Sequence, residues 1–142
     1  MDSPTDIEAW ATAYIAVHEA RASLDETHPG YLAAYHFMDE LVGPIAEECW
    51  QGILAVVHKR PSDWVLGMLA AGPVEDLLAC SGVQFIERIE IEARQNPDFR
   101  SMLHGAWRSG TPEIGRDLWR RVGHLRMPPN NLFKPRPLRS SA

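Results

Sequence analysis

The sequence predicts an all-α protein, a single compact orthogonal bundle of about seven or eight short helices with a flexible C-terminal tail. Three observations lead to this fold class. Proline recurs between a capping residue and a group of acids, as in the first turn of a helix. Apolar residues recur at spacings of three and four. No window alternates apolar and polar residues between hairpin turns, and no fixed repeat indicates a solenoid.

Six helix starts are marked along the chain. At five of them proline follows a small or capping residue, and acids follow where the positive end of the helix dipole favours them. These five are Ser3-Pro4, Gly43-Pro44, Gly72-Pro73, Asn96-Pro97 and Thr111-Pro112. Pro61-Ser62-Asp63 marks the sixth. Glu75 and Asp76 are thus expected in a first helical turn; the alternative is that this carboxylate pair faces a metal or a basic partner.

Apolar stripes at helical spacing lie between these starts, and a further helix is expected over Tyr31–Leu41. The stripes are Ile7, Trp10, Tyr14, Val17 and Leu24; Ile45, Cys49, Trp50, Ile53, Leu54 and Val57; Trp64, Met68 and Leu69; Val74, Leu77 and Leu78; Phe85, Ile86, Ile89 and Ala93; Phe99, Met102, Leu103, Ala106 and Trp107; Ile114, Leu118, Trp119 and Val122. Helix ends are expected at Gly72, Gly82 and Gly123. Core packing is expected for most of the five tryptophans, with one or two left to anchor a partner.

The helical domain is expected to span residues 1–123 and the tail residues 124–142, where several prolines block further helix. A chain of 142 residues suits one domain. Cys49 and Cys80 lie in apolar stretches without a CxxC partner, so both are expected to be buried, reduced thiols. The N-terminal acids and the lack of an apolar run of about 20 residues predict a cytoplasmic protein without membrane contact.

Charge is distributed unevenly along the chain, whose net charge is −5. Residues 1–57 carry ten acids and one base, whereas residues 100–142 carry nine bases and two acids. The middle part, residues 58–99, carries seven acids and four bases. A chain polarised in this way either pairs its own ends or presents an acidic face and a basic tail to different partners.

The stretch from Trp64 to Trp107 resembles a family of uncharacterised bacterial proteins, the DUF6869-like domain of unknown function. The residues that carry the resemblance are Leu69-Ala70-Ala71-Gly72-Pro73-Val74-Glu75-Asp76-Leu77-Leu78, Gly82, Phe85-Ile86, Ile89-Glu90, Ala93, Asn96-Pro97-Asp98-Phe99-Arg100, Leu103 and Trp107. They cover under a third of the chain. The resemblance implies a helical domain and brings no activity, cofactor or catalytic residue with it.

The best metal candidate is the group His36, Asp39 and Glu40, which stand at i, i+3 and i+4 of an expected helix. Side chains at this spacing converge on one face, as metal ligands do. The alternative is a solvated acidic helix face with an incidental histidine. The run from His18 to Ala22 starts like a zinc-protease helix but lacks the second histidine at i+4.

The basic C-terminal segment suggests a partner-binding surface, with Arg116, Arg120, Arg121 and Arg126 as its candidate residues. Basic residues interleaved with Trp107, Trp119 and Phe133 also fit a nucleic-acid surface that follows phosphates and stacks bases. The negative net charge favours instead pairing with an acidic surface, either of this chain or of a partner protein. A passive solvated tail is the third reading of this segment.

Recognisable catalytic motifs are absent from the sequence. It holds no G-x-S-x-G elbow, no P-loop and no G-x-G-x-x-G after a strand, so an enzyme is not favoured and no cofactor is expected. The leading hypothesis is a small acidic protein-protein interaction module, such as an inhibitor, an immunity-type protein or an adaptor, whose partner is another protein. A small metal-binding protein or metal-dependent enzyme is the alternative, and a nucleic-acid accessory protein a further one.

Overall fold

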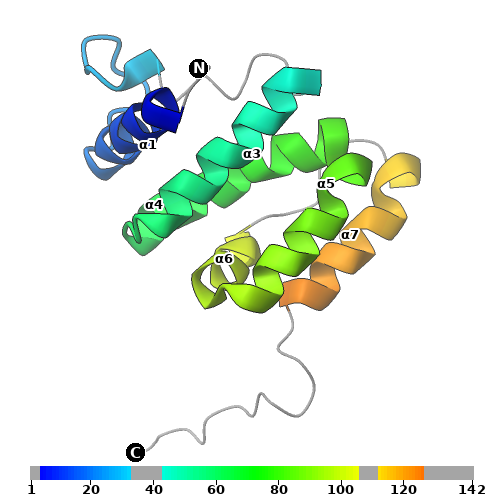
Figure 1. Cartoon of the computed structure of the whole chain (residues 1–142). Helices are drawn as coiled ribbons and strands as arrows, with labels where there is room; N and C mark the ends of the chain where they lie inside the picture. Colours follow the sequence, from blue (N-terminus) through cyan, green and yellow to red (C-terminus); the bar gives the residue numbers. More distant parts are fainter. Residues whose placement is uncertain (1–3, 33–42, 106–111, 127–142) are drawn as a thin grey trace, which may run out of the picture.

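A computed structural model describes residues 4–32, 43–105 and 112–126, and in these ranges all regular structure is helical (Figure 1). The elements are α1 (Pro4–Glu19), α3 (Gly43–His58), α4 (Asp63–Leu69), a π-helical turn (Ala70–Val74), α5 (Glu75–Gln95), α6 (Pro97–Met102), a 3-10 turn (Leu103–Gly105) and α7 (Pro112–Arg126). The predicted all-α class is confirmed. Tyr31 and Leu32 begin the helix expected there, and its remaining residues lie outside the described ranges.

The predicted helix starts are confirmed at five of the six positions. Helices α1 and α7 begin at Pro4 and Pro112, and α3 begins one residue before Pro44. The Ser62 side chain accepts a hydrogen bond from the backbone N–H of Val65 at the start of α4. The Asn96 side-chain oxygen Oδ1 accepts from the backbone N–H groups of Asp98 and Phe99 in α6, at 2.9 and 3.2 Å. These caps pair N–H groups that lack a partner within their helix.

The predicted boundary at Gly72-Pro73 is wrong, because the helix continues through it. Pro73 has no N–H to donate, and its ring would crowd the carbonyl four residues back in a regular α-helix. The π-helical turn resolves this: the N–H of Glu75 reaches the carbonyl of Ala70, five residues back. Glu75 and Asp76 stand in the first turn of α5 as expected, but this turn continues a helical segment that runs from residue 63 to residue 95.

The expected count of seven or eight helices is also wrong. Apart from the two residues Tyr31 and Leu32, the described residues form five continuous helical segments, because α4, the π-helical turn and α5 are joined and the 3-10 turn extends α6. Within α5 the chain bends at Ser81, whose φ of −143° and ψ of 23° are not helical. The break expected at Gly82 is thus a bend one residue earlier. Helix α7 continues past Gly123 to Arg126, beyond its predicted end.

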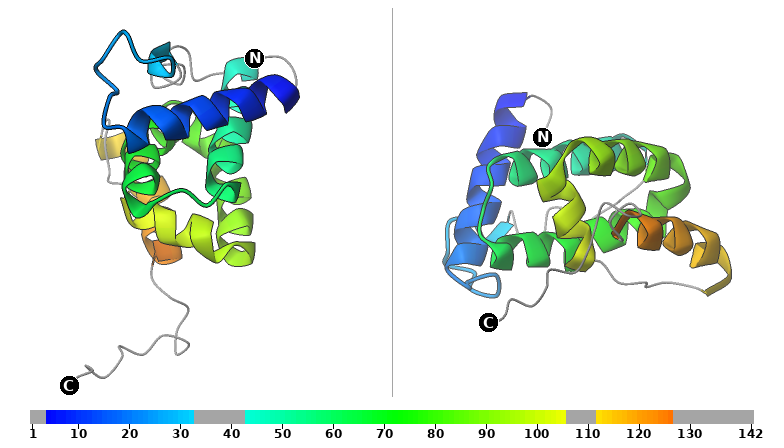
Figure 2. Two further views of the ribbon diagram at one scale, coloured as in Figure 1. Left: turned by 90° about the vertical axis from the view of Figure 1, so that its left-hand side faces the viewer. Right: turned by 90° about the horizontal axis from the view of Figure 1, so that it is seen from below.

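The core is one cluster of buried side chains to which all six α-helices contribute. Helix α1 packs on α3 and α4 at one side of the molecule, and α7 packs on α5 at the other (Figure 2). Trp10, Trp50 and Trp119 are buried as predicted. Trp64 is instead 43% exposed, with the Arg21 guanidinium stacked on its ring. Trp107 lies outside the described residues.

Two further burial predictions are wrong. Leu24 is exposed because α1 ends at Glu19 and Arg21, at a φ of 56°, turns the chain away before the apolar stripe reaches Leu24. Cys49 is buried as predicted, whereas Cys80 is exposed on the outer face of α5 next to the bend. An apolar stretch of sequence therefore did not place the Cys80 thiol in the core.

The helical segment from residue 63 to residue 95 is long and apolar enough to cross a membrane, by length and composition alone. Half of its most apolar window is buried inside the fold. The core helix of a globular domain can have the same length and apolar composition, so these two features are weak evidence for a membrane span.

Replacing Gly67, within α4, with alanine is expected to stabilise the protein by about 0.5–1 kcal/mol. A Cβ at this position meets nothing within 4 Å, and the backbone is not left-handed. The substitution therefore removes conformational freedom from the unfolded chain without a steric cost. Urea denaturation measures the change. Gly82→Ala is the contrast, because its Cβ would overlap Leu118 of α7; equal effects of the two substitutions would contradict this account.

Candidate anion-binding cleft

A cleft of about 330 Å³ opens where α5, α6 and α7 meet. We name it the α5–α7 cleft; its lining consists of Glu90, Ala93, Arg94, Arg100, Arg121, His124 and Leu125. Four of these side chains are basic or can become so, and one is acidic. Helices α5 and α7 lie side by side, and α6 lies close to the ends of both (Figure 1).

The lining residues come from one face of each helix. On α5 they stand at i, i+3 and i+4 from Glu90, and on α7 they stand at i, i+3 and i+4 from Arg121. The two helices run in the same direction, because Gly82 lies against Leu118 near one end while Glu90 binds Arg121 further along. Their C-terminal turns therefore lie together, and α6 adds Arg100 between them.

An ion pair between Glu90 of α5 and Arg121 of α7 joins the two helices at the cleft. Arg121 donates two hydrogen bonds to the Glu90 carboxylate, Nε to Oε2 at 2.9 Å and Nη2 to Oε1 at 2.7 Å. The Glu90 side chain is 18% exposed and the Arg121 side chain 37%. The Arg121 hydrogen bonds hold the pKa of Glu90 below its ordinary value, and the charges of Arg121 and Arg94 add to the effect. Glu90 is therefore a carboxylate at neutral pH.

Arg100 has a structural contact at the end of α7. Its Nε donates to the backbone carbonyl of Leu125 at 3.0 Å, which pairs a carbonyl of the last helical turn. The C-terminal ends of α5 and α7 each contribute about half a negative charge to this region. The described lining carries three guanidinium groups against one carboxylate, that of Glu90.

The model of a family of unknown function, DUF6869, matches residues 19–129 of the chain. The chain belongs to the DUF6869 family. The resemblance predicted over residues 64–107 is thereby confirmed and extends over most of the chain. The match includes every residue that lines the α5–α7 cleft, whereas α1 lies almost entirely before it. A search of the curated proteins and a search of the solved structures found no match.

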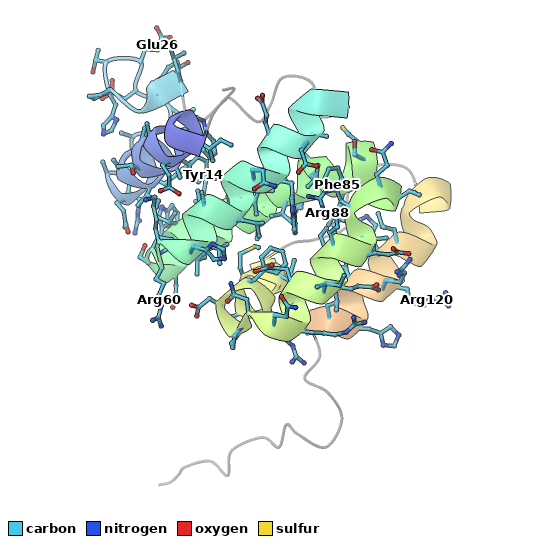
Figure 3. The ribbon with its side chains drawn as sticks, viewed as in Figure 1. Tyr14, Glu26, Arg60, Phe85, Arg88 and Arg120 are labelled. Carbon is cyan, nitrogen blue, oxygen red and sulfur yellow. The ribbon has the colours of Figure 1, made fainter. Side chains whose placement is uncertain are left out.

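We call an arginine that donates two hydrogen bonds to one carboxylate, as Arg121 does to Glu90, a clamp. A second clamp of the same geometry lies on another face of α5 in this DUF6869 protein. Arg88 donates to the Glu47 carboxylate of α3 from Nη1 at 2.7 Å and from Nη2 at 2.9 Å. Figure 3 shows Arg88 and Phe85 on the side of α5 that faces α3. The hydrogen bonds from Arg88 and Gln51 lower the pKa of Glu47 to about 2. Neither residue of this pair lines the cleft.

Of the four arginines predicted to bind a partner, the structure places Arg121 in the cleft. Arg120 is exposed and points outward from α7 (Figure 3). Arg116 and Arg126 belong to α7, but their side chains lie outside the described part. Partner binding by these residues stays a prediction; of the two whose side chains are described, Arg121 lines the cleft and Arg120 does not.

Sequence reasoning missed Glu90, Arg94, Arg100 and His124 as members of a site. The available signal was the charged i, i+3, i+4 pattern around Glu90 and around Arg121. That pattern shows that each group shares one helix face. It does not show that the two faces meet, because their meeting depends on how α7 packs on α5.

The metal-site and nucleic-acid hypotheses have less support from the described residues. His36, Asp39 and Glu40 lie outside them, and the described part of the chain contains no cluster of three or more potential metal ligands. For nucleic acid, Trp119 is buried in the core and so is not placed to stack on a base. Trp107 and Phe133 lie outside the described ranges, as does the proposed tail beyond Arg126.

Proposed function

We propose that this DUF6869 protein is a protein-protein interaction module that binds an acidic segment of its partner in the α5–α7 cleft. The observation that carries the proposal is the convergence of Arg94, Arg100, Arg121 and His124 on one cleft with a single carboxylate, Glu90. A guanidinium group presents planar N–H donors that match a carboxylate. The cleft is thus suited to an acidic side chain.

The size of the cleft supports a short segment as the occupant. Its volume of about 330 Å³ lies at the lower end of the range for ligand sites, enough for a few side chains. Ile91, the residue after Glu90 in α5, is 50% exposed, so the same helical turn also offers an apolar contact to the partner. An acidic residue flanked by apolar residues combines both features.

Charge reversal of Arg94 tests this function. Arg94 is exposed, so Arg94→Glu is expected to fold normally while it replaces a cation of the cleft with an anion. At low ionic strength we expect roughly tenfold or greater loss of affinity for blocked peptides in which glutamate is flanked by leucine, measured by fluorescence anisotropy. Raised salt should weaken the binding of the unmodified protein.

Arg120→Glu is the matched control, because it makes the same charge change on α7 at a side chain that points outward (Figure 3). We expect it to change the affinity by about twofold at most, since surface charges are screened. Equal losses in the two variants would show attraction to the net charge only. No binding of any acidic peptide by the unmodified protein would contradict the proposed function.

A further inference from the structure

We infer that Glu90 is an internal competitor in the α5–α7 cleft, which occupies Arg121 in the free protein and limits how tightly an external anion binds. This inference rests on the proposed function, because it concerns the same cleft. It assigns to Glu90 a role in setting the affinity of the cleft for an anion and its selectivity among anions. It also predicts an unusual result, a substitution inside the binding site that improves binding.

The first argument is geometric. Glu90 takes two N–H donors of Arg121, at 2.9 and 2.7 Å, in the fork-to-fork arrangement that an acidic ligand would itself use. A ligand carboxylate must therefore displace Glu90 from this edge or bind Arg94 and Arg100 beside it. Glu90 is 18% exposed, so a ligand in the cleft can reach it.

The second argument concerns which anions the cleft accepts. The Glu90 carboxylate lies among the cations that would attract a ligand, so every further negative charge that enters is repelled by it. A nucleic acid carries a full charge on every phosphate, so the phosphates nearest the cleft are all repelled by Glu90. An acidic protein segment brings one or two carboxylates and apolar neighbours for Ile91. Glu90 therefore favours the acidic segment over a phosphodiester chain.

The chain supplies its own control for this idea. Glu47 and Arg88 form a clamp with the same two distances, 2.7 and 2.9 Å, on a face of α5 away from the cleft. Glu90→Gln and Glu47→Gln change the net charge equally, and each removes a carboxylate from an arginine fork. Only Glu90→Gln removes it from the cleft lining.

The experiment compares four proteins: the unmodified chain, Glu90→Gln, Glu47→Gln and the double variant Glu90→Gln/Arg121→Gln. Binding of the glutamate-leucine peptides and of a single-stranded oligonucleotide is measured at low salt. We expect Glu90→Gln to raise peptide affinity roughly three- to tenfold. Glu47→Gln should stay within about twofold. The double variant should fall back to the unmodified level or below, because Arg121 provides the gain.

The outcomes separate this inference from the proposed function. Peptide binding that Arg94→Glu abolishes but Glu90→Gln leaves unchanged or weakens would overturn the competitor role of Glu90 and leave the function standing. An equal gain from Glu47→Gln would also overturn it, since net charge alone would then explain the effect. Tighter binding of the unmodified protein, which carries Glu90, to the oligonucleotide than to the peptides would overturn the ligand class. Absence of peptide binding in all four proteins would overturn both proposals. Circular dichroism verifies that each variant folds.

Discussion

Replacing Phe99 with alanine is expected to lower the free energy of unfolding by about 3–5 kcal/mol, a large part of the stability of a domain this size. Phe99 is fully buried, and its ring meets that of Trp50 edge to face, with centroids 5.7 Å apart. Helix α6 has six residues, too few to be stable alone, so Phe99 and Met102 anchor it to the core. The substitution leaves a cavity at this anchor.

The Phe99→Ala substitution should also disturb the α5–α7 cleft, because Arg100, which lines the cleft, is the next residue in α6. When α6 loosens, its hydrogen bond to the Leu125 carbonyl weakens and the cleft loses one wall. Urea denaturation measures the stability change. Phe99→Leu keeps most of the side-chain volume and should cost less than about 2 kcal/mol, which allows a measurement if the alanine variant does not fold. An alanine variant about as stable as the unmodified protein would refute this role of Phe99.

Acidification is expected to destabilise the fold in two pH windows, of which His18 produces the upper one. His18 is buried at the end of α1, its ring 4.5 Å from that of Tyr14, and burial lowers its pKa below 6.5. Below about pH 6.5 the unfolded chain therefore binds a proton that the folded chain does not, and stability falls by at most about 1.4 kcal/mol per pH unit. The fall ends below the folded-state pKa of His18.

The lower pH window arises from the carboxylates of Glu47 and Glu90, each of which accepts hydrogen bonds from an arginine. Arg88 and Gln51 lower the pKa of Glu47 to about 2, and Arg121 lowers that of Glu90. Their contribution is present above their ordinary pKa of 4.5 and is lost as the pH falls toward the folded-state values. Both pairs are partly exposed, so the loss from each is modest. Burial raises the pKa of Asp76, which acts in the opposite sense.

Thermal unfolding between about pH 8 and about pH 3 measures both windows. His18→Leu should remove the fall just below about pH 6.5 and leave the lower window in place. A variant without His18 that still loses stability between about pH 6.5 and about pH 5 would show that another group is responsible.

Local chemistry made most helix starts predictable. Ser62 and Asn96 cap their helices whatever surrounds them, since each side chain bonds to backbone a few residues away. Gly72-Pro73 carries the same signal and misled, because α4 and α5 pack in the core as one run and a π-helical turn accommodates the missing N–H. A capping pattern thus indicates that a helix can start, and tertiary packing decides whether a helix already present ends there.

The candidate site was predictable only in fragments. The concentration of bases after residue 100 pointed to Arg121, and its role as a cleft residue agrees with the basic character expected of that segment. The decisive partners, Glu90 and Arg94, come from a helix whose charges are mixed and whose composition attracts no notice. Core packing was expected for most tryptophans, with base stacking an alternative for Trp119, and its burial decided for packing.

The sequence by itself determined that this protein is helical, where most helices begin, and that its charge is polarised. These properties follow from interactions among residues a few positions apart. Only the tertiary structure decided that α5 and α7 run in the same direction with their last turns together, and that Glu90 lies within reach of Arg121. Contacts between residues 31 positions apart depend on packing of the whole core, so no local pattern encodes them.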